Sequence, residues 1–260
     1  MNAGPASFTI RVDGIRDEHG STWLGALDLT LHDDGTTTVS VPDQAHLYGV
    51  LAGLRDLGAG LLEVRPGPPG GLPRSLLDRP LHTARLVLRP ATAADADPTW
   101  RYRRLPSVNE WLYGSPDDPD AYREMFSDPA RLATTVVVTL GHDAAAPVIG
   151  DLMLSRADAW AQRTVADQAR GMEAELGWTF DPAHTGHGFA TEAVRELIRY
   201  CFQDLGVRRV TASCFLANTR SRRLMERVGM RCEQHAVRES LHRSGRWLDT
   251  VGYALLREEW

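Results

Sequence analysis

A run of small residues stands directly before an amphipathic segment in the second half of the chain. TGHGFA, residues 185–190, contains Gly186 and Gly188 and leads into the apolar periodicity of TEAVRELIRYCF. Backbone N–H groups at the start of a helix lack intrahelical acceptors, and glycine leaves them uncovered. With the positive end of the helix dipole they form a site suited to a phosphate or pyrophosphate. The alternative is that the glycines only make a tight strand-to-helix turn.

Two common phosphate-binding fingerprints do not fit this stretch. A P-loop would continue with Gly-Lys-Ser/Thr, and the dinucleotide fingerprint needs a third glycine and an acidic residue at a strand end. Neither pattern is present in residues 185–190 or just after them. We therefore expect the anion to be part of a different cofactor.

Two carboxylates lie on the segment just upstream, MEAELGWTF, residues 172–180. Strand alternation places Glu173, Glu175 and Thr179 on one face and the apolar residues on the other. A carboxylate beside an anion site could take a proton from an incoming ammonium group. The alternative is that both glutamates are solvated strand residues.

The elements that would position these groups alternate between strands and helices. One helix is expected over residues 188–205, with its packing face formed by Ala190, Ala193, Val194, Leu197, Ile198, Cys201, Phe202 and Leu205. Strands are expected around residues 84–92, 133–140, 148–155, 172–180, 208–215, 230–240 and 247–256. Further helices are expected up to about Arg131 and over residues 218–229, with a polar loop at 156–171. This order predicts a mixed α/β sheet with helices on its faces.

The first part of the chain is a smaller unit. Alternating segments at residues 7–14 and 22–35, with a hairpin turn at Asp34-Gly35, are typical of strands, and residues 60–66 supply another. Between them, a helix is expected from an N-cap at Asp43, with its apolar face formed by Leu47, Val50, Leu51, Leu54 and Leu57. Asp43, His46 and Tyr48 are interpreted as capping and surface residues. The Pro- and Gly-rich stretch that follows predicts three parts: a domain at 1–66, a linker at 67–82 and a domain at 83–260.

The overall composition narrows the function classes. The chain has 260 residues and a formal net charge of −5, which gives no indication of nucleic-acid or membrane binding. No apolar run approaches a bilayer span, and the N-terminus does not resemble a signal peptide. Cys201, Cys214 and Cys232 are an odd number without metal-like spacing, as expected for free thiols in the cytoplasm. His184 and His187 have no third ligand in sight, so no metal is expected.

The segments AELGWTFDPAHTGHGFATEAVRELIRYCF, NTRSRRLMERVGMR and DTVGYALLREEW occur in this order and together resemble the GNAT superfamily of acyl-CoA-dependent N-acetyltransferases. With TARLVLRPAT at the first strand, the chain is most similar to the branch of the bacterial ribosomal-protein N-terminal (Rim-type) acetyltransferases, over about residues 83–260. The resemblance implies a mixed, mostly antiparallel sheet flanked by helices. The preceding unit, an α+β domain with a short antiparallel sheet and one helix, resembles a module of high-GC bacterial chains through DGTTT, DQAHLYGVL and LRDLG.

The family's cofactor loop reads Arg/Gln-x-x-Gly-x-Gly/Ala, and this chain departs from it only at Thr185, where relatives have a long polar side chain. The loop holds pyrophosphate mainly through backbone N–H groups, so we expect acetyl-CoA binding to survive this departure. The residues that the resemblance assigns to the cofactor are Trp178, Thr185, Gly186, His187, Gly188, Phe189, Ala190, Thr191 and Asn218. Asn218 would contact the pantetheine arm.

The resemblance also implies catalytic roles. Glu175 corresponds to a glutamate that takes the amine proton, directly or through water. Many relatives have a tyrosine at the position of Met225 as the acid toward the thiolate, and methionine cannot donate a proton. In the Rim-like branch a serine is the candidate instead, and Ser221 stands at that position. The alternative for Ser221 is packing at a helix N-terminus.

Several other residues carry weaker indications. Arg220, Arg222 and Arg223 could approach the ribose phosphate of the cofactor or be solvated. Asp249 matches a common family aspartate, either structural or at the acceptor site. Trp100, Trp111 and Tyr113 could wall a pocket, and core packing would explain them equally well.

The sequence thus predicts a cytoplasmic acetyl-CoA-dependent N-acetyltransferase with direct amine attack in a ternary complex. The acceptor would be a protein N-terminus or a small-molecule amine, and an acidic chain favours a cationic one. No metal, nucleic acid or membrane is expected, and a homodimer is left open. The alternative from another class is a non-catalytic acyl-CoA-binding protein whose first domain docks a partner.

Overall fold

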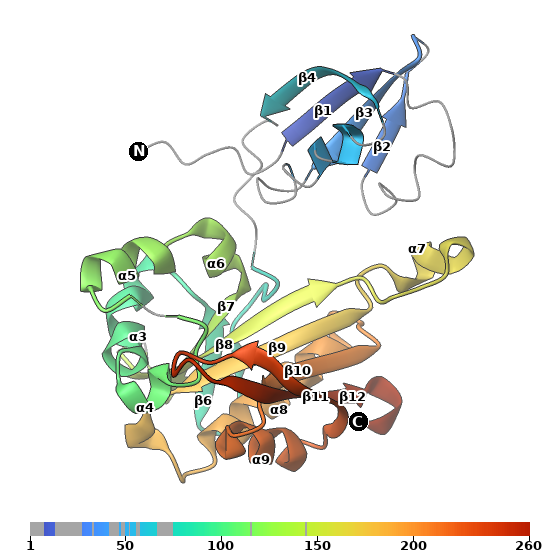
Figure 1. Cartoon of the computed structure of the whole chain (residues 1–260). Helices are drawn as coiled ribbons and strands as arrows, with labels where there is room; N and C mark the ends of the chain where they lie inside the picture. Colours follow the sequence, from blue (N-terminus) through green and yellow to red (C-terminus); the bar gives the residue numbers. More distant parts are fainter. Residues whose placement is uncertain are drawn as a thin grey trace. The chain divides into compact units, whose positions relative to one another are not determined.

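The computed structural model describes residues 8–13, 28–32, 34–41, 47, 50–51, 53–55, 58–66, 75–114, 116–143 and 145–260. The chain divides into two compact units, Met1–Arg74 and Ser75–Trp260. The strands and helices of each unit can be followed by their labels in Figure 1. None of the described helices is both long and apolar enough to cross a lipid bilayer.

The first unit contains a four-stranded antiparallel sheet in the order β2-β3-β1-β4. Its strands are β1 (Phe8–Asp13), β2 (Asp28–Leu31), β3 (Thr36–Val41) and β4 (Gly60–Pro66). The expected turn is present: His32 N–H donates to Thr36 O at 2.9 Å, and Gly35 has a φ of 80°. Residues 47, 50–51 and 53–55 are helical, and three of them complete the core with strand residues Ile10, Val12, Val39 and Val41. Asp43, His46, Tyr48 and Leu57 lie outside the described residues.

The second unit is built on an eight-stranded sheet in the order β11-β12-β10-β9-β8-β7-β6-β5. The strands are β5 (Leu81–His82), β6 (Leu86–Pro90), β7 (Thr135–Leu140), β8 (Val148–Ala157), β9 (Glu173–Phe180), β10 (Arg209–Phe215), β11 (Arg231–Leu241) and β12 (Trp247–Leu256). Neighbouring strands are antiparallel except β9 and β10, which are parallel. The expected mixed and mostly antiparallel sheet is confirmed.

The helices of this unit are α3 (Ala96–Arg103), α4 (Pro106–Asn109), α5 (Pro119–Phe126), α6 (Pro129–Thr134), α7 (Ala166–Ala169), α8 (Phe189–Gln203) and α9 (Thr219–Arg227). The polar stretch before β7 is broken into short helices because prolines occupy their first positions. Asp118 and Asp128 cap two of them by accepting backbone N–H groups at 2.8 and 2.9 Å. The loop expected after β8 contains α7, which projects from the end of the sheet (Figure 1).

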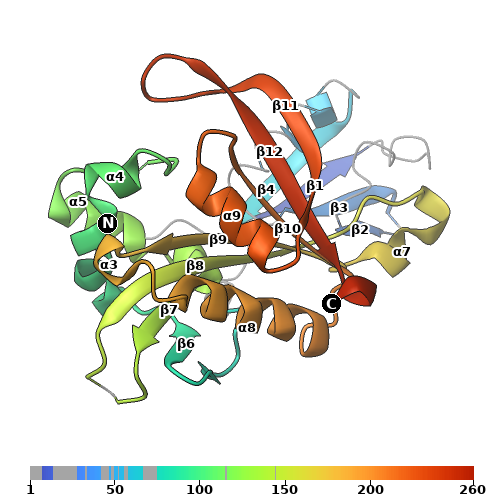
Figure 2. The same ribbon diagram turned by 90° about the horizontal axis from the view of Figure 1, so that it is seen from below.

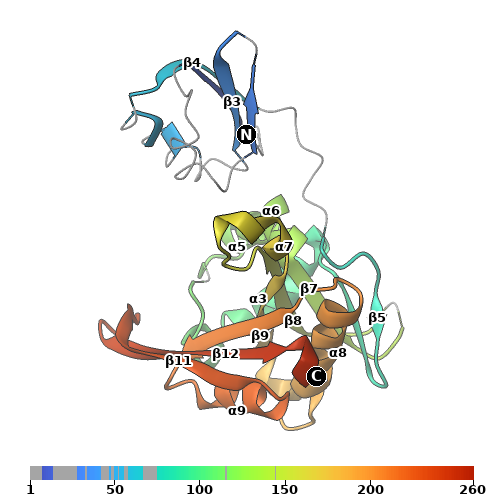
Figure 3. The same ribbon diagram turned by 90° about the vertical axis from the view of Figure 1, so that its right-hand side faces the viewer.

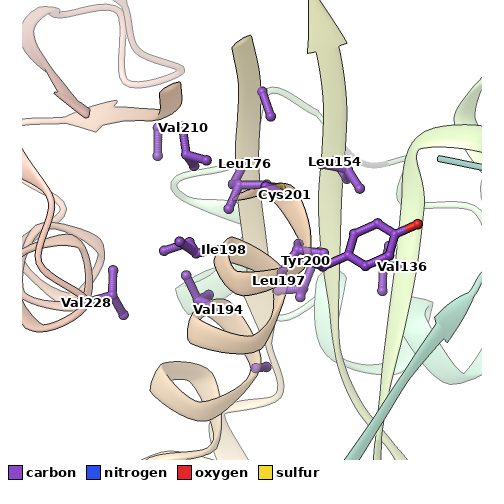
Figure 4. Close-up of a cluster of buried hydrophobic side chains, with 14 of the residues drawn as sticks. Val136, Leu154, Leu176, Val194, Leu197, Ile198, Tyr200, Cys201, Val210 and Val228 are labelled. Carbon is purple, nitrogen blue, oxygen red and sulfur yellow. The ribbon is translucent and has the colours of Figure 1, made fainter. Parts of the chain in front are cut away.

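The two faces of the central strands are covered by different helices. Alternate residues such as Leu154 and Leu176 pack against α8, whose Val194, Leu197 and Ile198 are at most 1% exposed (Figure 4). The intervening residues face α3, where the Tyr102 hydroxyl donates to Asp151 at 2.6 Å. The apolar face predicted for α8 therefore packs on one face of the sheet. The helices before β7 cover the other face.

The segment just before β6 belongs to the second unit. Residues 75–82, interpreted from composition as the end of the linker, contribute Leu77 and Leu81, which are 1% and 4% exposed, to the main core. The Tyr200 hydroxyl on α8 donates to Leu76 O at 2.9 Å. Apolar side chains inside a proline-rich segment thus pack on the domain, while the unit boundary lies at Arg74.

Candidate functional site

The parallel strands β9 and β10 pair only at their beginnings. Their register runs from Arg209↔Glu173 to Thr211↔Glu175, although β9 continues to Phe180 and β10 to Phe215. Beyond Glu175, β9 is bonded only to β8, and β10 only to β12, among the described strands. The two strands therefore part and leave main-chain groups facing a gap in the middle of the sheet.

A large cleft runs through this gap, with a volume of about 2690 Å³. On one face of the sheet it is lined by Trp178, Cys214 and the N-terminus of α8. On the other it is lined by Glu175 and Phe215 together with residues of the α3–α6 segment. A single ligand pocket for a drug-sized molecule has a volume of roughly 300–1,000 Å³, so this cleft can hold two substrates at once.

The glycine loop forms one end of the cleft. Gly186 and Gly188 have φ values of 85° and 79°, the left-handed region that glycine enters at no steric cost. Gly188 is the N-cap of α8, and Glu192 N–H is the first to bond back, to Gly188 O at 3.0 Å. No backbone N–H of residues 186–191 donates a hydrogen bond to any described part of the protein. The loop thus presents a row of free donors at a helix N-terminus, an arrangement that favours an anion.

Arg85, which precedes β6, holds this loop in place. Its Nη1 donates to His187 O at 3.0 Å, and its Nε donates to Glu192 at 2.7 Å. The guanidinium carbon lies 4.6 Å from the centroid of the Phe189 ring, which in turn stacks on His187 at 5.5 Å. Thr83 also donates to Glu192, at 2.6 Å. Sequence reasoning missed this clamp because its partners are more than a hundred residues apart.

The clamp keeps Glu192 ionised. Burial alone would raise the pKa of the Glu192 carboxyl, but hydrogen bonds from Thr83 and Arg85 outweigh it and hold the pKa below its usual value. The carboxylate lies in the first turn of α8, where a negative charge is favourable. The anion site therefore has a cation, Arg85, fixed beside it by a carboxylate that is charged at neutral pH.

The start of α9 lies against β10 on the face of the sheet that α8 covers. Asn218 caps the helix, its Oδ1 accepting from Ser221 N–H at 3.2 Å. Burial raises the pKa of the Cys214 thiol, on β10. Ser221, Asn218 and Cys214 all line the cleft. Met225 is fully buried in the core and cannot reach the cleft.

The structure distinguishes the two glutamates of β9. Glu173 is paired with Arg209, with 3.3 Å between Arg209 Nε and Glu173 Oε1. Glu175 is exposed, lines the cleft at the point where the strands part, and has no ion-pair partner among the described residues. Of the two, Glu175 is therefore the carboxylate without an ion-pair partner that reaches the cleft.

The face opposite α8 carries an aromatic wall. Trp111, just after α4, lies 6.1 Å from Phe215 and 5.7 Å from His242, measured between ring centroids. His242 belongs to the turn of the β11–β12 hairpin, and its Nε2 lies 3.0 Å from Glu110 O. Figures 2 and 3 show this long hairpin extending beyond the rest of the sheet. The hairpin and the segment after α4 together close one side of the cleft.

The structure brings most of the sequence candidates to this cleft. Those that line it are Glu175, Trp178, Thr185, Gly186, Gly188, Phe189, Ala190, Thr191, Asn218 and Ser221. His187 does not line it, and its contribution is its carbonyl, which Arg85 holds. Thr185 turns its hydroxyl back to Pro182 O, at 2.8 Å. Within the described residues, no group of three His, Cys, Asp or Glu side chains is arranged to hold a metal.

The remaining candidates divide between structural and cleft positions. Trp111 and Tyr113 line the cleft, whereas Trp100, on α3, packs against the cluster formed with Tyr122 and Phe126 of α5. Asp249 is structural: it accepts from Arg238 N–H at 2.9 Å and pairs with His235 at 2.8 Å, which holds the irregular part of β11. Arg220 and Arg223, both on α9, line the cleft.

Comparison with known families and relatives agrees with this geometry. Residues 85–231 match the family model of the acetyltransferase (GNAT) domain, and residues 7–65 match a domain of unknown function, DUF8691. The uncharacterized N-acetyltransferase YnaD of Bacillus subtilis is 35% identical over 86 residues, 33% of this chain and 50% of that protein. The putative ribosomal N-acetyltransferase YdaF of the same organism is 36% identical over 88 residues, 34% of this chain and 48% of that protein. The match spans about half the length of each of these two relatives.

Solved structures share the fold. An acetyltransferase of the GNAT family from Bacillus anthracis has a TM-score of 0.59 at 24% identity, covering 70% of this chain and 100% of that one. RimJ of Mycobacterium smegmatis, in complex with CoA-disulfide, has a TM-score of 0.52 at 23% identity, covering 67% and 83%. At these identities the likeness is one of fold.

Proposed function

Since the chain belongs to the GNAT acetyltransferase family, we propose that it transfers an acetyl group from acetyl-CoA to a primary amine. The observation that carries the proposal is the parting of β9 and β10, with free loop amides at one side and the unpaired Glu175 at the other. Through such a gap, a thioester held on the face that α8 covers could reach the opposite face, where the amine would enter. The similarity of RimJ, whose structure contains CoA-disulfide, supports CoA as the carrier.

The residues present fit such a cofactor. The amides of residues 186–191 would hold the pyrophosphate, with Arg85 as a nearby cation. The unpaired edges of β9 and β10 offer main-chain donors and acceptors to the amide groups of a pantetheine arm. Thr185, despite its departure from the family pattern, uses its hydroxyl inside the loop and leaves the amides free. When bound, acetyl-CoA supplies the activated acetyl group.

Glu175 is proposed to start the reaction by accepting a proton from the acceptor's ammonium group, directly or through one water. The free amine then attacks the thioester carbonyl carbon, a C–N bond forms, and the C–S bond breaks. Ser221, which lines the cleft at the start of α9, would donate a hydrogen bond or proton to the leaving thiolate. The products are the N-acetylated amine, CoA as the thiol, and one proton released to solvent.

The similarity to YdaF, a putative ribosomal N-acetyltransferase, supports a place in the Rim-type branch and an acceptor that is a protein N-terminus or a small amine. Neither Cys214 nor Cys201 is suited to act as a covalent nucleophile. Burial raises the pKa of the Cys214 thiol, which lines the cleft, and so disfavours its thiolate. Cys201 is fully buried, and burial raises the pKa of its thiol to about 12. Direct attack in a ternary complex therefore fits the residues around the gap.

The test mixes purified full-length protein and acetyl-CoA with a pooled panel of amines and follows release of the CoA thiol. The panel holds N-terminal peptides, polyamines and aminoglycosides, with a control that lacks amine. Release above this control, with an acetylated product detected by mass, is the expected result. A protein that binds acetyl-CoA but acetylates no member of the panel would favour the non-catalytic acyl-CoA-binding alternative.

A further inference from the structure

A guanidinium group without a partner faces the amine side of the cleft. Arg131, on α6, lines the same cleft as Glu175. Its Nε atom is buried and makes no hydrogen bond, and no described carboxylate lies within ion-pair distance of it. Its guanidinium carbon lies 6.0 Å from the centroid of the Phe126 ring. A half-buried cation with only an aromatic neighbour is costly unless an anion joins it.

The charges around Arg131 do not supply that anion. Asp151 and Asp128 attract Arg131 only from beyond ion-pair distance. Asp151 is 3% exposed and is already engaged by Arg103, whose Nε lies 2.9 Å from Oδ1, and by the Tyr102 hydroxyl at 2.6 Å. Asp128 accepts backbone N–H groups at the start of α6. Asp151 is thus paired with Arg103 and leaves Arg131 without a counter-ion at ion-pair distance among the described residues. Burial, and after it repulsion from Arg103, lowers the pKa of Arg131. The end of the cleft near α6 therefore carries a net positive charge.

The opposite charge stands on the same face of the sheet. Strand register pairs Asp151 with Thr179 and Ser155 with Glu175, so all four side chains lie on one face. Thr179 and Glu175 are four residues apart on β9, which corresponds to roughly 13 Å along a strand. Glu110 and Glu239 also line the cleft, from the segment after α4 and from β11. The cleft is thus positive at α6 and acidic toward the parted strands.

We propose that the acceptor is an amine that also bears a carboxylate, which Arg131 binds while Glu175 takes the proton of the amine. The inference rests on the proposed function, because Glu175 has this role only if an amine is acetylated. A guanidinium group binds a carboxylate through two parallel hydrogen bonds. Di- to tetrapeptides span roughly 7 to 14 Å when extended, which matches the separation along β9. An amine without an anion would leave Arg131 unpaired.

The test compares acceptors that differ only in one charge. Alanine di-, tri- and tetrapeptides are used as free acids and as C-terminal amides, together with amidated tripeptides that carry Glu or Gln at the third position. The first set probes a small-molecule carboxylate, and the second probes an acidic side chain near a protein N-terminus. For wild type, kcat/KM should be roughly 10- to 100-fold higher for the carboxylate member of a pair, mainly through KM.

Arg131→Gln should reduce this ratio to about one, and Arg131→Lys should restore part of it. Arg170→Gln is the matched control, since Asp167 in the α7 loop is its one ion-pair partner among the described residues and Arg170 does not line the cleft. Arg131→Gln should not lower the unfolding temperature, because it removes an unpaired charge; a merely structural arginine would lower it. Equal rates for acids and amides in wild type, or an unchanged ratio in Arg131→Gln, would overturn the proposal. Acetylation of neither member of any pair, nor of a polyamine, would instead count against the acetyltransferase function itself.

Discussion

Gly186→Ala is expected to weaken acetyl-CoA binding without a steric clash. A Cβ at Gly186 would meet no atom within 4 Å, so the only cost is the positive φ of 85°. For a residue with a side chain, this conformation costs about 1–2 kcal/mol. Because the backbone of Gly186 makes no hydrogen bond within the described chain, its peptide units can relax without ligand while Arg85 still holds the His187 carbonyl. Bound acetyl-CoA must then restore the loop, so the dissociation constant should rise roughly 5- to 30-fold.

Gly245→Ala supplies the matched control. Gly245 has a φ of 78° and also no atom within 4 Å of an added Cβ, but it lies in the β11–β12 turn. There its N–H donates to His242 O at 2.9 Å, so the strain remains in the folded protein and lowers stability by about 1–2 kcal/mol. At about 2–4 °C per kcal/mol, the unfolding temperature should fall by roughly 2–8 °C.

Both variants are measured by calorimetric titration with acetyl-CoA and by thermal unfolding without ligand. Weaker binding should appear in Gly186→Ala alone, and the larger loss of unfolding temperature in Gly245→Ala. Equal dissociation constants for wild type and both variants would refute the reasoning that the loop amides hold the cofactor.

Three further outcomes are expected from the same structure. Glu192→Gln should destabilise the protein by about 1–2 kcal/mol at pH 7, because it breaks charge-assisted hydrogen bonds. The pKa of Glu192 is lowered in the folded state, so this stabilisation is present when the pH is above the usual glutamate pKa and is lost as the pH falls through the lowered pKa. The unfolding temperatures of wild type and Glu192→Gln should therefore differ at pH 7 and approach each other at pH 3. Ile198→Ala, at a side chain with 0% exposure, should cost about 2–5 kcal/mol in denaturant titrations, and a smaller loss would contradict the packing of α8. In thiol labelling at pH 8, the exposed Cys232 should react first and the buried Cys201 only after unfolding. Cys214 should react slowly, and more slowly still when CoA is present. Labelling of Cys214 at a rate that CoA does not change would contradict its place in the cleft.

Local pattern was sufficient to predict the elements that carry the site. The periodicity of α8 is strong, and its predicted face, with Val194, Leu197 and Ile198, is buried. Strand alternation in β9 separated the polar from the apolar face. The short helices before β7 also had a signal that could have located them, since Asp118 and Asp128 each precede a proline.

The features that long-range contacts determine were not available from the sequence. Arg85 reaches Glu192 across 107 positions, and no local pattern joins them. The choice between the two glutamates of β9 depends on Arg209, which pairs with Glu173 from the neighbouring strand. The parting of β9 and β10 depends on their other neighbours, because β9 is hydrogen-bonded to β8 and β10 to β12 along the part where the two strands separate. Tertiary packing, rather than residue type, decides each of these.

The most direct test of the central claim compares Glu175→Gln with Glu173→Gln. Both glutamates lie on the same face of β9, but only Glu175 lines the cleft without a partner. With the best amine from the panel, kcat/KM should fall by roughly 10²–10⁴-fold in Glu175→Gln, while acetyl-CoA binds with the wild-type dissociation constant. Glu173→Gln should retain near wild-type turnover. Equal turnover of Glu175→Gln and wild type across pH 6–9 would contradict the account.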